Sequence, residues 1–422
     1  MKSEWITASV AELEADGTIL VQDGNHGEYR PRRHELDPAG TPHIRAADIS
    51  DSGVIDFDGA QRINDQALAR IRKGVGAPGD VILTHKGTVG RVARVPARAP
   101  HFVCSPQTTF WRSREPDRLD QGFLFGYLRS PGFAAQLRRR MHESDMAPYV
   151  SLTTQRSLLV PLPPIERQRA IAAVLGALDD KIDSNRRLAG LLEETAAALF
   201  RARFVDFVGV DEFEDSELGP IPRGWQAGSL VDLAKFVNGK AFTKHASGAG
   251  RPILRIRELN QGVDGQTLRA ELDVEDLYIA HADDILFAWS GSLGVYRWPG
   301  DESLINQHIF KVVPEGTPKW FVHRWIEEHM DSFRSVAADK ATTMGHIQRR
   351  HLAEARVAVP CGDALEDADR VVGPIDQHRA ALVQESRTLT ELREALLPKL
   401  ISGEIRVPDT ADPAEVIEPM VA

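Results

Sequence analysis

The sequence predicts an α+β fold: two tandem α/β domains separated by two long helices that form an antiparallel coiled coil, with an internal pseudo-twofold repeat. Short motifs recur in the same order roughly 200 residues apart, a period that is typical of a duplicated domain and too long for a solenoid. Two further segments carry apolar residues at heptad spacing. The predicted boundaries are 1–160 for the first domain, 161–208 for the first helix, 209–360 for the second domain, 361–408 for the second helix and 409–422 for an acidic, disordered tail.

The repeated motifs keep their order along the chain. Trp5 to Leu13 returns as Trp225 to Leu233, with the shared pattern W-x3-S-[VL]-x-[DE]-L. The other matched segments are Pro42 to Ile49 with Pro252 to Leu259, Gly79 to Gly90 with Asp283 to Gly294, Pro106-Gln107 with Asn306-Gln307, and Val160 to Pro163 with Val357 to Pro360. Two copies of one surface on one chain imply a target with two parts.

The two domains are expected to consist mainly of short strands and turns. Residues 1–160 are rich in apolar alternation, glycine and proline, which favours strands joined by turns. One helix is expected from about Gly122 to Met141, because Phe123, Leu124 and Tyr127 begin an apolar face at helical spacing. Pro161 to Pro164 should then separate the first domain from the first long helix, since proline suits a first turn and not a helix interior.

The two long helices are predicted from about Ile165 to Phe204 and from about Glu366 to Ile401, where Ser402-Gly403 gives a stop signal. Their predicted seam comprises Leu175, Leu178, Ile182, Asn185, Leu192 and Leu199 in the first helix, and Val372, Ile375, Leu382, Leu389, Leu396 and Leu400 in the second. Polar seam residues such as Asn185 and Arg379 commonly set the register of a helix pair. The two seams could pair with each other, or the segments could be two ordinary amphipathic core helices.

Composition excludes several classes of protein. No stretch approaches the ~18 uncharged apolar residues of a membrane helix. The two cysteines, Cys104 and Cys361, lie far apart and fit a cytoplasmic protein without a disulfide framework. The net charge of −10 would ordinarily argue against nucleic acid, but basic residues gather locally, as at Arg138 to Arg140 and at Gln348 to His351. The acidic total suggests that a basic partner shares any contact with DNA.

Three segments carry a resemblance to a known family. Pro161-Leu162-Pro163-Pro164-Ile165-Glu166-Arg167-Gln168-Arg169-Ala170-Ile171-Ala172 resembles the signature that opens the first conserved helix in specificity subunits of type I restriction-modification systems. Leu218 to Trp225 is similar to the family's entry into its second domain, and Leu396 to Ile405 resembles its closing helix. The sequence departs from the pattern at Glu166-Arg167-Gln168, where the family usually has adjacent Glu-Gln. It departs again at Cys361 to Ala364, where the second helix lacks the expected start.

The resemblance implies a subunit that reads DNA and catalyses no reaction. Such a subunit binds a bipartite, asymmetric site on double-stranded DNA, one half per target-recognition domain, and its helices dock two methyltransferase subunits. Restriction-translocase subunits join later, and S-adenosylmethionine, ATP and Mg would bind those partners, leaving this chain without a cofactor. The sequence has no Asn/Asp-Pro-Pro-aromatic motif and no G-x-x-x-x-G-K-[ST] loop. The alternatives are a pseudo-dimeric protein–protein adaptor that does not bind DNA and the recognition half of a split methyltransferase-nuclease.

Candidate DNA-binding residues lie at the duplicated turns and in the arginine runs, because groove recognition uses polar side chains on loops and helix starts. Arg45 and Arg255 are either matched phosphate contacts or matched buried salt bridges. Side chains that differ between the copies are the better specificity candidates, since the two half-sites should differ. Histidine spacing indicates no metal site. The remaining candidates are His85, Lys86, Thr88, Arg138, Arg139 and Arg140 in the first copy, and Trp289, Ser290, Ser292, Gln348, Arg349 and Arg350 in the second.

Overall fold

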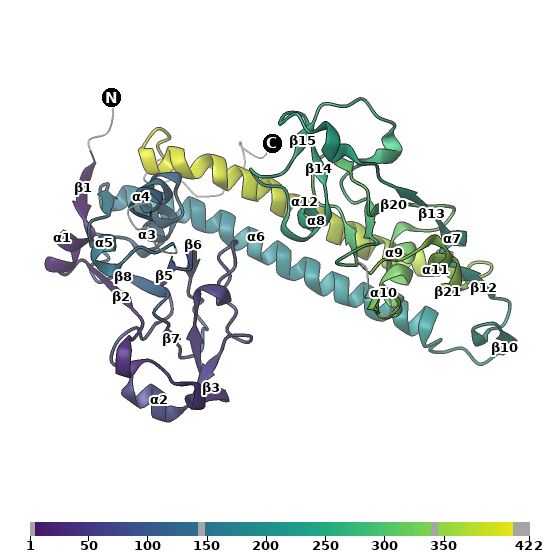
Figure 1. The fold of residues 1–422 in the computed structure, drawn as a ribbon, viewed down its shortest axis with the longest axis horizontal. Coiled ribbons are helices and arrows are strands. Elements are labelled where there is room, and N and C mark those ends of the chain that lie inside the picture. Colours follow the sequence, from purple (N-terminus) through teal and green to yellow (C-terminus); the bar gives the residue numbers. More distant parts are fainter. Residues whose placement is uncertain (1–4, 142–147, 339–344, 408–422) are drawn as a thin grey trace. The chain divides into compact units, whose positions relative to one another are not determined.

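The computed structural model describes residues 5–141, 148–338 and 345–407 (Figure 1). The predicted tail at 409–422 lies outside the described residues. The chain divides into two compact units. Unit 1 comprises Met1–Lys181 and Leu389–Ala422, and unit 2 comprises Ile182–Thr388. Each long helix therefore contributes one part to each unit.

Within its described residues, unit 1 contains three small sheets. The largest has the strand order β2-β8-β5-β6, formed by β2 (Ile19–Asp23), β8 (Thr108–Ser113), β5 (Val81–Lys86) and β6 (Thr88–Arg94). The second has the order β4-β3-β7, formed by β4 (Arg62–Ile63), β3 (Leu36–Ile44) and β7 (Val103–Cys104), with β3 parallel to β7. The third pairs β1 (Ile6–Ser9) with β9 (Leu159–Leu162). The α-helices of the domain are α1 (Val10–Ala15), α2 (Asp65–Arg70), α3 (Gln121–Leu128), α4 (Pro131–Met141) and α5 (Leu152–Arg156).

Unit 2 repeats this topology, with one additional strand, β16, in its second sheet. Its largest sheet has the order β13-β20-β17-β18, formed by β13 (Ala234–Asn238), β20 (Ile309–Pro314), β17 (Ile285–Ala288) and β18 (Gly294–Arg297). The second sheet consists of β15 (Arg269–Ala270), β14 (Arg251–Leu254), β19 (Ser303–Ile305) and β16 (Ile279–Ala280), with β14 parallel to β19. The third pairs β12 (Gln226–Ser229) with β21 (Arg356–Val359). The internal repeat predicted from the sequence is therefore present in the strand order of both units.

The helices of unit 2 are α7 (Leu230–Leu233), α8 (Ile256–Gln261), α9 (Lys319–Glu328), α10 (Met330–Ala338) and α11 (Arg349–Glu354). Most of them follow in the same order as those of unit 1, but α2 lies after β4 whereas α8 lies directly after β14. A hairpin of β10 (Phe213–Ser216) and β11 (Gly219–Pro222) precedes them. The short helical turns of the chain are η1 (Gly27–Tyr29), η2 (Arg33–Glu35), η3 (Ala46–Asp48), η4 (Arg201–Val205), η5 (Phe242–His245) and η6 (Asp276–Tyr278).

The first repeated motif forms a strand end followed by a capped helix. Ser9 precedes α1, and its backbone N–H donates to the Glu12 carboxylate at 2.7 Å. In the second copy the N–H of Ser229 donates to the Asp232 carboxylate at 2.8 Å before α7. A capping box satisfies backbone groups that a helix start leaves unpaired, which explains why the serine and the acid recur together.

The single helix predicted from Gly122 to Met141 is wrong in one respect, because α3 ends at Leu128 and α4 begins at Pro131. Proline has no N–H to continue the α3 ladder, and its ring restricts the residue before it. The hydroxyl of Ser130 accepts a hydrogen bond from the N–H of Phe133 at 3.3 Å. The break thus starts a new helix instead of kinking one.

The two long helices are α6 (Ile165–Phe200) and α12 (Ala364–Ser402). Most predicted seam residues are buried: Leu175, Leu178, Leu389, Leu396 and Leu400 in unit 1, and Ile182, Asn185, Val372 and Leu382 in unit 2. Leu192 and Ile375 are half-buried. Leu199 was wrongly placed in the seam, since 38% of it is exposed. Its neighbours Ala196 and Phe200 enter the core of unit 2 instead, so the buried face turns away from the heptad position.

Polar residues in the seam have partners on the facing helix. In unit 2 the Asn185 amide donates to the Glu385 carboxylate at 2.8 Å, and Arg379 pairs with Glu193 at 3.2 Å. Moving forward along α6 from Asn185 to Glu193 therefore corresponds to moving backward along α12, as in antiparallel helices. In unit 1 Arg393 pairs with Asp179 at 2.7 Å.

Over the described ranges, no helix combines the length and apolar character needed to span a membrane.

Candidate nucleic-acid interface

Each unit carries an equivalent site where the central strand β5 or β17 ends. In unit 1 the N–H of His85 donates to the carbonyl of Gln107 at 2.9 Å, and the N–H of Val150 donates to the carbonyl of His85 at 2.9 Å. The N–H of Gly87 donates to the carbonyl of Pro148 at 3.1 Å. These three bonds join the end of β5 to the β7–β8 turn and to the segment that precedes α5.

Unit 2 makes the same three bonds. The N–H of Trp289 donates to the carbonyl of His308 at 3.1 Å, the N–H of Ile347 donates to the carbonyl of Trp289 at 2.8 Å, and the N–H of Gly291 donates to the carbonyl of Gly345 at 3.1 Å. Position by position, Trp289 therefore stands where unit 1 has His85, and His308 stands where it has Gln107. The sequence match of Gln107 with Gln307 is wrong by one residue, because the strand pairing aligns Gln107 with His308. We call these two places the strand-end sites of unit 1 and unit 2.

The predicted turn residues divide between surface and interior. Lys86, Thr88 and Ser292 are exposed, and Trp289 is half-buried. His85 and Ser290 are 0% and 6% exposed, so these two predictions are wrong: neither side chain has the free surface that contact with DNA needs. β5 is paired on both sides, by β6 and β8, and five of its six residues are buried.

Arg45 and Arg255 form matched salt bridges, which was one of the two alternatives left open by the sequence. Arg45 donates to both carboxylate oxygens of Asp48 at 3.0 and 2.8 Å, and Arg255 does the same to Glu258 at 3.0 and 2.6 Å. Burial would raise the pKa of Glu258, but hydrogen bonds from Arg255 outweigh it and hold that pKa below its ordinary value. Both guanidiniums are thus engaged inside their own unit, and their contact with phosphate stays a prediction.

The two arginine runs do not occupy equivalent places. Arg138 to Arg140 end α4, whose counterpart by order is α10. Arg349 and Arg350 begin α11, whose counterpart is α5. Arg138 and Arg139 are exposed, and within the described ranges no hydrogen bond or ion pair engages either side chain.

The second run is exposed as well, but both of its arginines have partners. Arg349 donates to the Phe236 carbonyl at 3.1 Å, and Arg350 donates to the His351 ring at 3.3 Å. Gln348 caps α11. All five exposed members of the two runs, Arg138, Arg139, Gln348, Arg349 and Arg350, stay candidates for DNA contact, and Arg140 is half-buried.

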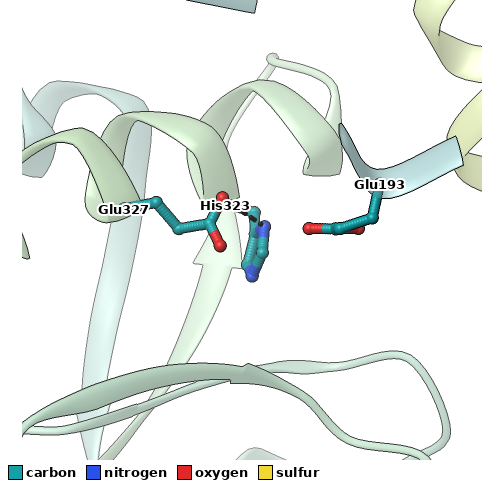
Figure 2. Close-up of side chains that lie close together, drawn as sticks. All are labelled: Glu193, His323 and Glu327. Atoms are coloured by element: carbon teal, nitrogen blue, oxygen red, sulfur yellow. Dashed lines mark ion pairs between the residues drawn. The ribbon is translucent and has the colours of Figure 1, made fainter. Parts of the chain in front are cut away.

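One group of side chains in unit 2 has the composition of a metal site. Figure 2 shows Glu193 of α6 facing His323 and Glu327 of α9, with the potential ligand atoms within 4.8 Å of one another. Arg324 already bridges the two carboxylates, at 2.7 Å to Glu193 and 2.6 Å to Glu327. A cation would have to displace this guanidinium, which makes the group an ion-pair network and not a site built for metal. Burial keeps the pKa of His323 well below its ordinary value, so the imidazole is neutral.

The duplicated domains match one family of known proteins. The model of the type I restriction modification DNA specificity domain matches the chain twice, over residues 30–194 and 222–361. The chain belongs to this family. It is 22% identical over 399 residues to the type I restriction enzyme MjaIX specificity subunit of Methanocaldococcus jannaschii, covering 87% of each chain. It is 22% identical to the HindI specificity subunit of Haemophilus influenzae, over 62% of this chain and 72% of that one.

A solved structure supports the same fold. The chain is similar to the S subunit of a type I restriction-modification system from M. genitalium, with a TM-score of 0.55, 14% sequence identity, and coverage of 94% of this chain and 96% of that one. The resemblance seen in the sequence is confirmed. The chain is a type I specificity subunit, a DNA-recognition component and not a catalytic one.

Two buried histidines give the specificity subunit a predictable dependence on pH. Burial lowers the pKa of His43 and of His85 to about 4, whereas both would titrate near 6.5 in the unfolded chain. The unfolded state therefore binds more protons below pH 6.5, and stability falls as pH falls. Lowering the pH from 6.5 to 5.5 should reduce the free energy of unfolding of unit 1 by about 1 kcal/mol per histidine.

Hydrogen exchange of unit 1 peptides at the two pH values, corrected for the intrinsic exchange rate, would measure this loss. The variant His43→Gln should lose about half of the pH dependence that the two histidines supply. An equal pH dependence in the variant and the parent would contradict a neutral buried His43.

Two further pairs of equivalent positions were not found from the sequence. Gly24 and Gly239 follow β2 and β13, and a side-chain carbon at either one would collide with backbone atoms of the β7–β8 or β19–β20 turn. They mark a second pair of equivalent positions, Asp23 and Asn238, directly before them. The number of residues between these two glycines differs from the spacing of the neighbouring repeated motifs. Their equivalence is therefore visible only in the pairing of the strands.

Proposed function

We propose that unit 1 and unit 2 each bind one half of a bipartite, asymmetric site on double-stranded DNA. The observation that carries this proposal is the repetition of one topology with two separate matches to the DNA specificity domain. The two units share one backbone arrangement and would present equivalent surfaces to DNA. The side chains of the two strand-end sites differ and would select different sequences.

We further propose that α6 and α12 form an antiparallel coiled coil and that the two copies are related by a pseudo-twofold axis. Supporting this, the cross-helix pairs Asn185–Glu385 and Arg379–Glu193 run in opposite directions along the two helices. Single polar pairs inside an apolar seam fix register, so these contacts would hold the helices in one alignment.

The proposed bipartite site is tested by selecting bound duplexes from a random DNA library with the full chain and its methyltransferase partner. Two fixed blocks separated by a spacer of arbitrary sequence should emerge. A single block would overturn the assignment of one half-site to each domain. No enrichment at all, with an intact protein complex, would instead favour the adaptor that does not bind DNA.

Two methyltransferase subunits are the proposed partners of the helix pair, and restriction-translocase subunits would join that complex. S-adenosylmethionine, ATP and Mg would then bind these partners. Supporting a docking role, α6 exposes Leu188, Leu191 and Leu199 in unit 2, at 40, 60 and 38%. On a helix these positions fall along one stripe. Exposed apolar stripes of this kind are typical of surfaces that meet another protein.

Leu191→Glu should therefore weaken capture of a methyltransferase subunit by at least tenfold, because a carboxylate at a buried interface loses its hydration without gaining a partner. Co-purification of the two proteins measures the effect. The matched control is Arg186→Gln, which lowers the net charge equally on another exposed part of the same helix. Equal binding by Leu191→Glu and the control would remove the stripe from the interface.

A further inference from the structure

The two strand-end sites have one backbone and two sets of side chains. The isolated bridges Lys86–Tyr149 and Ser290–His346 extend the equivalence established by the three backbone hydrogen bonds. Ring contacts repeat as well, at 5.7 Å between His85 and Tyr149 and at 6.4 Å between Trp289 and His346. The equivalent residues, unit 1 first, are Asp23 and Asn238, His85 and Trp289, Lys86 and Ser290, Gln107 and His308, Tyr149 and His346, and Ser151 and Gln348.

Every one of these pairs differs in chemistry although the backbone around it is the same. A change at six equivalent positions is expected of a site whose two copies meet different ligands. Two unlike half-sites differ in their bases and share the same phosphate backbone. The changed side chains therefore point to base recognition and not to phosphate contacts.

Each strand-end site also contains a buried ring nitrogen that lacks a partner. The Nε2 atom of His85 and the Nδ1 atom of His308 make no hydrogen bond within the described ranges. Buried polar atoms are almost always satisfied in folded proteins. Each copy therefore holds one unsatisfied buried nitrogen beneath its exposed side chains, and these nitrogens do not themselves meet DNA.

The exposed groups of the unit 1 site are cationic. The Lys86 ammonium lies 5.6 Å from the centre of the Tyr149 ring, which leaves its hydrogens available to a ligand. Lys73 and His26 pair with Asp23 beside it, at 2.5 and 2.7 Å, so the carboxylate there is already occupied. Lysine is a donor to the O6 and N7 acceptors of guanine in the major groove.

The exposed groups of the unit 2 site are neutral amides. The carbonyl oxygen of Asn238 accepts a hydrogen bond from the Trp289 indole at 2.8 Å, which fixes the orientation of the amide. Its nitrogen has no hydrogen-bond partner in the part of the chain that the structure describes. Gln348 lies 3.5 Å from the His346 ring through its amide nitrogen, and both amides are exposed. Asparagine and glutamine pair with the N6 and N7 edge of adenine.

We propose that the strand-end sites are the base-reading sites of this specificity subunit, unit 1 recognising a guanine through Lys86 and unit 2 recognising an adenine through the amides of Asn238 and Gln348. This inference rests on the proposed bipartite function. His85 and Trp289 act as positioning residues, because they orient the neighbouring side chains without offering free donors of their own.

The test compares variants of the full chain, each assembled with its methyltransferase partner, by selection from a random duplex library. Binding and not methylation is measured, so that the base to be modified does not bias the result. Lys86→Ala should make one G·C position in one half-site nearly random and leave the other half unchanged. Asn238→Ala and Gln348→Ala should do the same to an A·T position in the opposite half, with discrimination falling about 5- to 150-fold, the range of one specific side-chain contact.

A substitution with a gained preference separates base recognition from simple damage. Asn238→Asp places in unit 2 the residue that unit 1 carries at the equivalent position, and a carboxylate accepts from the N4 amino group of cytosine. The selected base should therefore change from adenine to cytosine at one position. Two controls belong beside it: Gln261→Ala, an exposed amide at the end of α8, which should change nothing, and Arg139→Ala, which should weaken binding to all sequences and reduce the salt slope by about one.

The outcomes are distinguishable. If the parent complex selects two blocks and the strand-end variants keep every selected base while binding more weakly overall, the sites only support the sheet or touch phosphates, and the inference is wrong. If the parent complex selects no bipartite sequence, the proposed function itself fails. Thermal unfolding midpoints of the variants equal to that of the parent would exclude loss of folding as the cause of a changed selection.

Discussion

Replacing Arg297 by alanine should lower the stability of unit 2 by about 3–5 kcal/mol, the usual cost of removing one partner from a buried ion pair. The Arg297 side chain is 6% exposed. It extends from β18 and pairs with Asp283 at 2.5 Å and with Asp376 of α12 at 3.0 Å. Without the guanidinium, two carboxylates would remain in a largely buried place with fewer cations to compensate them.

Two further cations pair with Asp283 in this network. Arg379 of α12 pairs with Asp283 at 3.2 Å, and Lys319 pairs with it at the same distance. Burial would raise the pKa of Asp283, but hydrogen bonds and charge from Arg297 outweigh it, and the pKa lies below its ordinary value. The network therefore stabilises unit 2 at neutral pH, and its contribution is lost as pH falls through that lowered pKa.

Chemical denaturation of the full chain, followed by hydrogen exchange of unit 2 peptides, measures the loss. The matched control is Arg334→Ala, which removes an arginine whose partner Asp331 is 95% exposed. Pairs of that kind contribute about 0–1 kcal/mol. If the two variants lose the same stability, Arg297 is not holding β18 to α12.

The organisation of the chain was predictable from the sequence because two strong periodic signals carried it. The motif repeat predicted a duplicated topology, and the heptads predicted both helices to within a few residues of their observed ends. Leu199 shows the limit of that periodicity. Heptad spacing states which residues can face a partner helix, but the aromatic core around Phe200 and Phe204 decides where the last turns of α6 actually face.

The candidate site was only partly predictable. His85 and Lys86 are adjacent in the duplicated turn, yet one is buried and the other exposed, because β5 is covered by neighbouring strands until its last residue. Gln107 and Tyr149 meet His85 only through pairing between segments distant in sequence. No local pattern links them, whereas the backbone hydrogen bonds do so directly.

Exchanging the first domain for that of a relative with a different target should replace one half of the recognised sequence completely and leave the other half unchanged. The exposed candidates of unit 1, Lys86, Thr88, Arg138 and Arg139, all lie within residues 1–160, and those of unit 2 lie within 209–360. A methylome of cells that carry each chimaera reads both halves in one experiment.

The structure also decides where the exchange should be made. β9 ends at Leu162 and pairs with β1, so a junction after Leu162 keeps both strands from one parent, whereas a junction at residue 150 separates them. The retained part of α6 contacts the exchanged domain through Gln168, whose carbonyl accepts the Asp120 N–H at 2.9 Å, and through Asp179, which pairs with Arg129 at 2.9 Å. A relative whose domain carries the counterparts of Asp120 and Arg129 should give a folded chimaera with one new half-site. A chimaera that folds and methylates with both halves changed, or with neither changed, would show that recognition is not divided between the two domains.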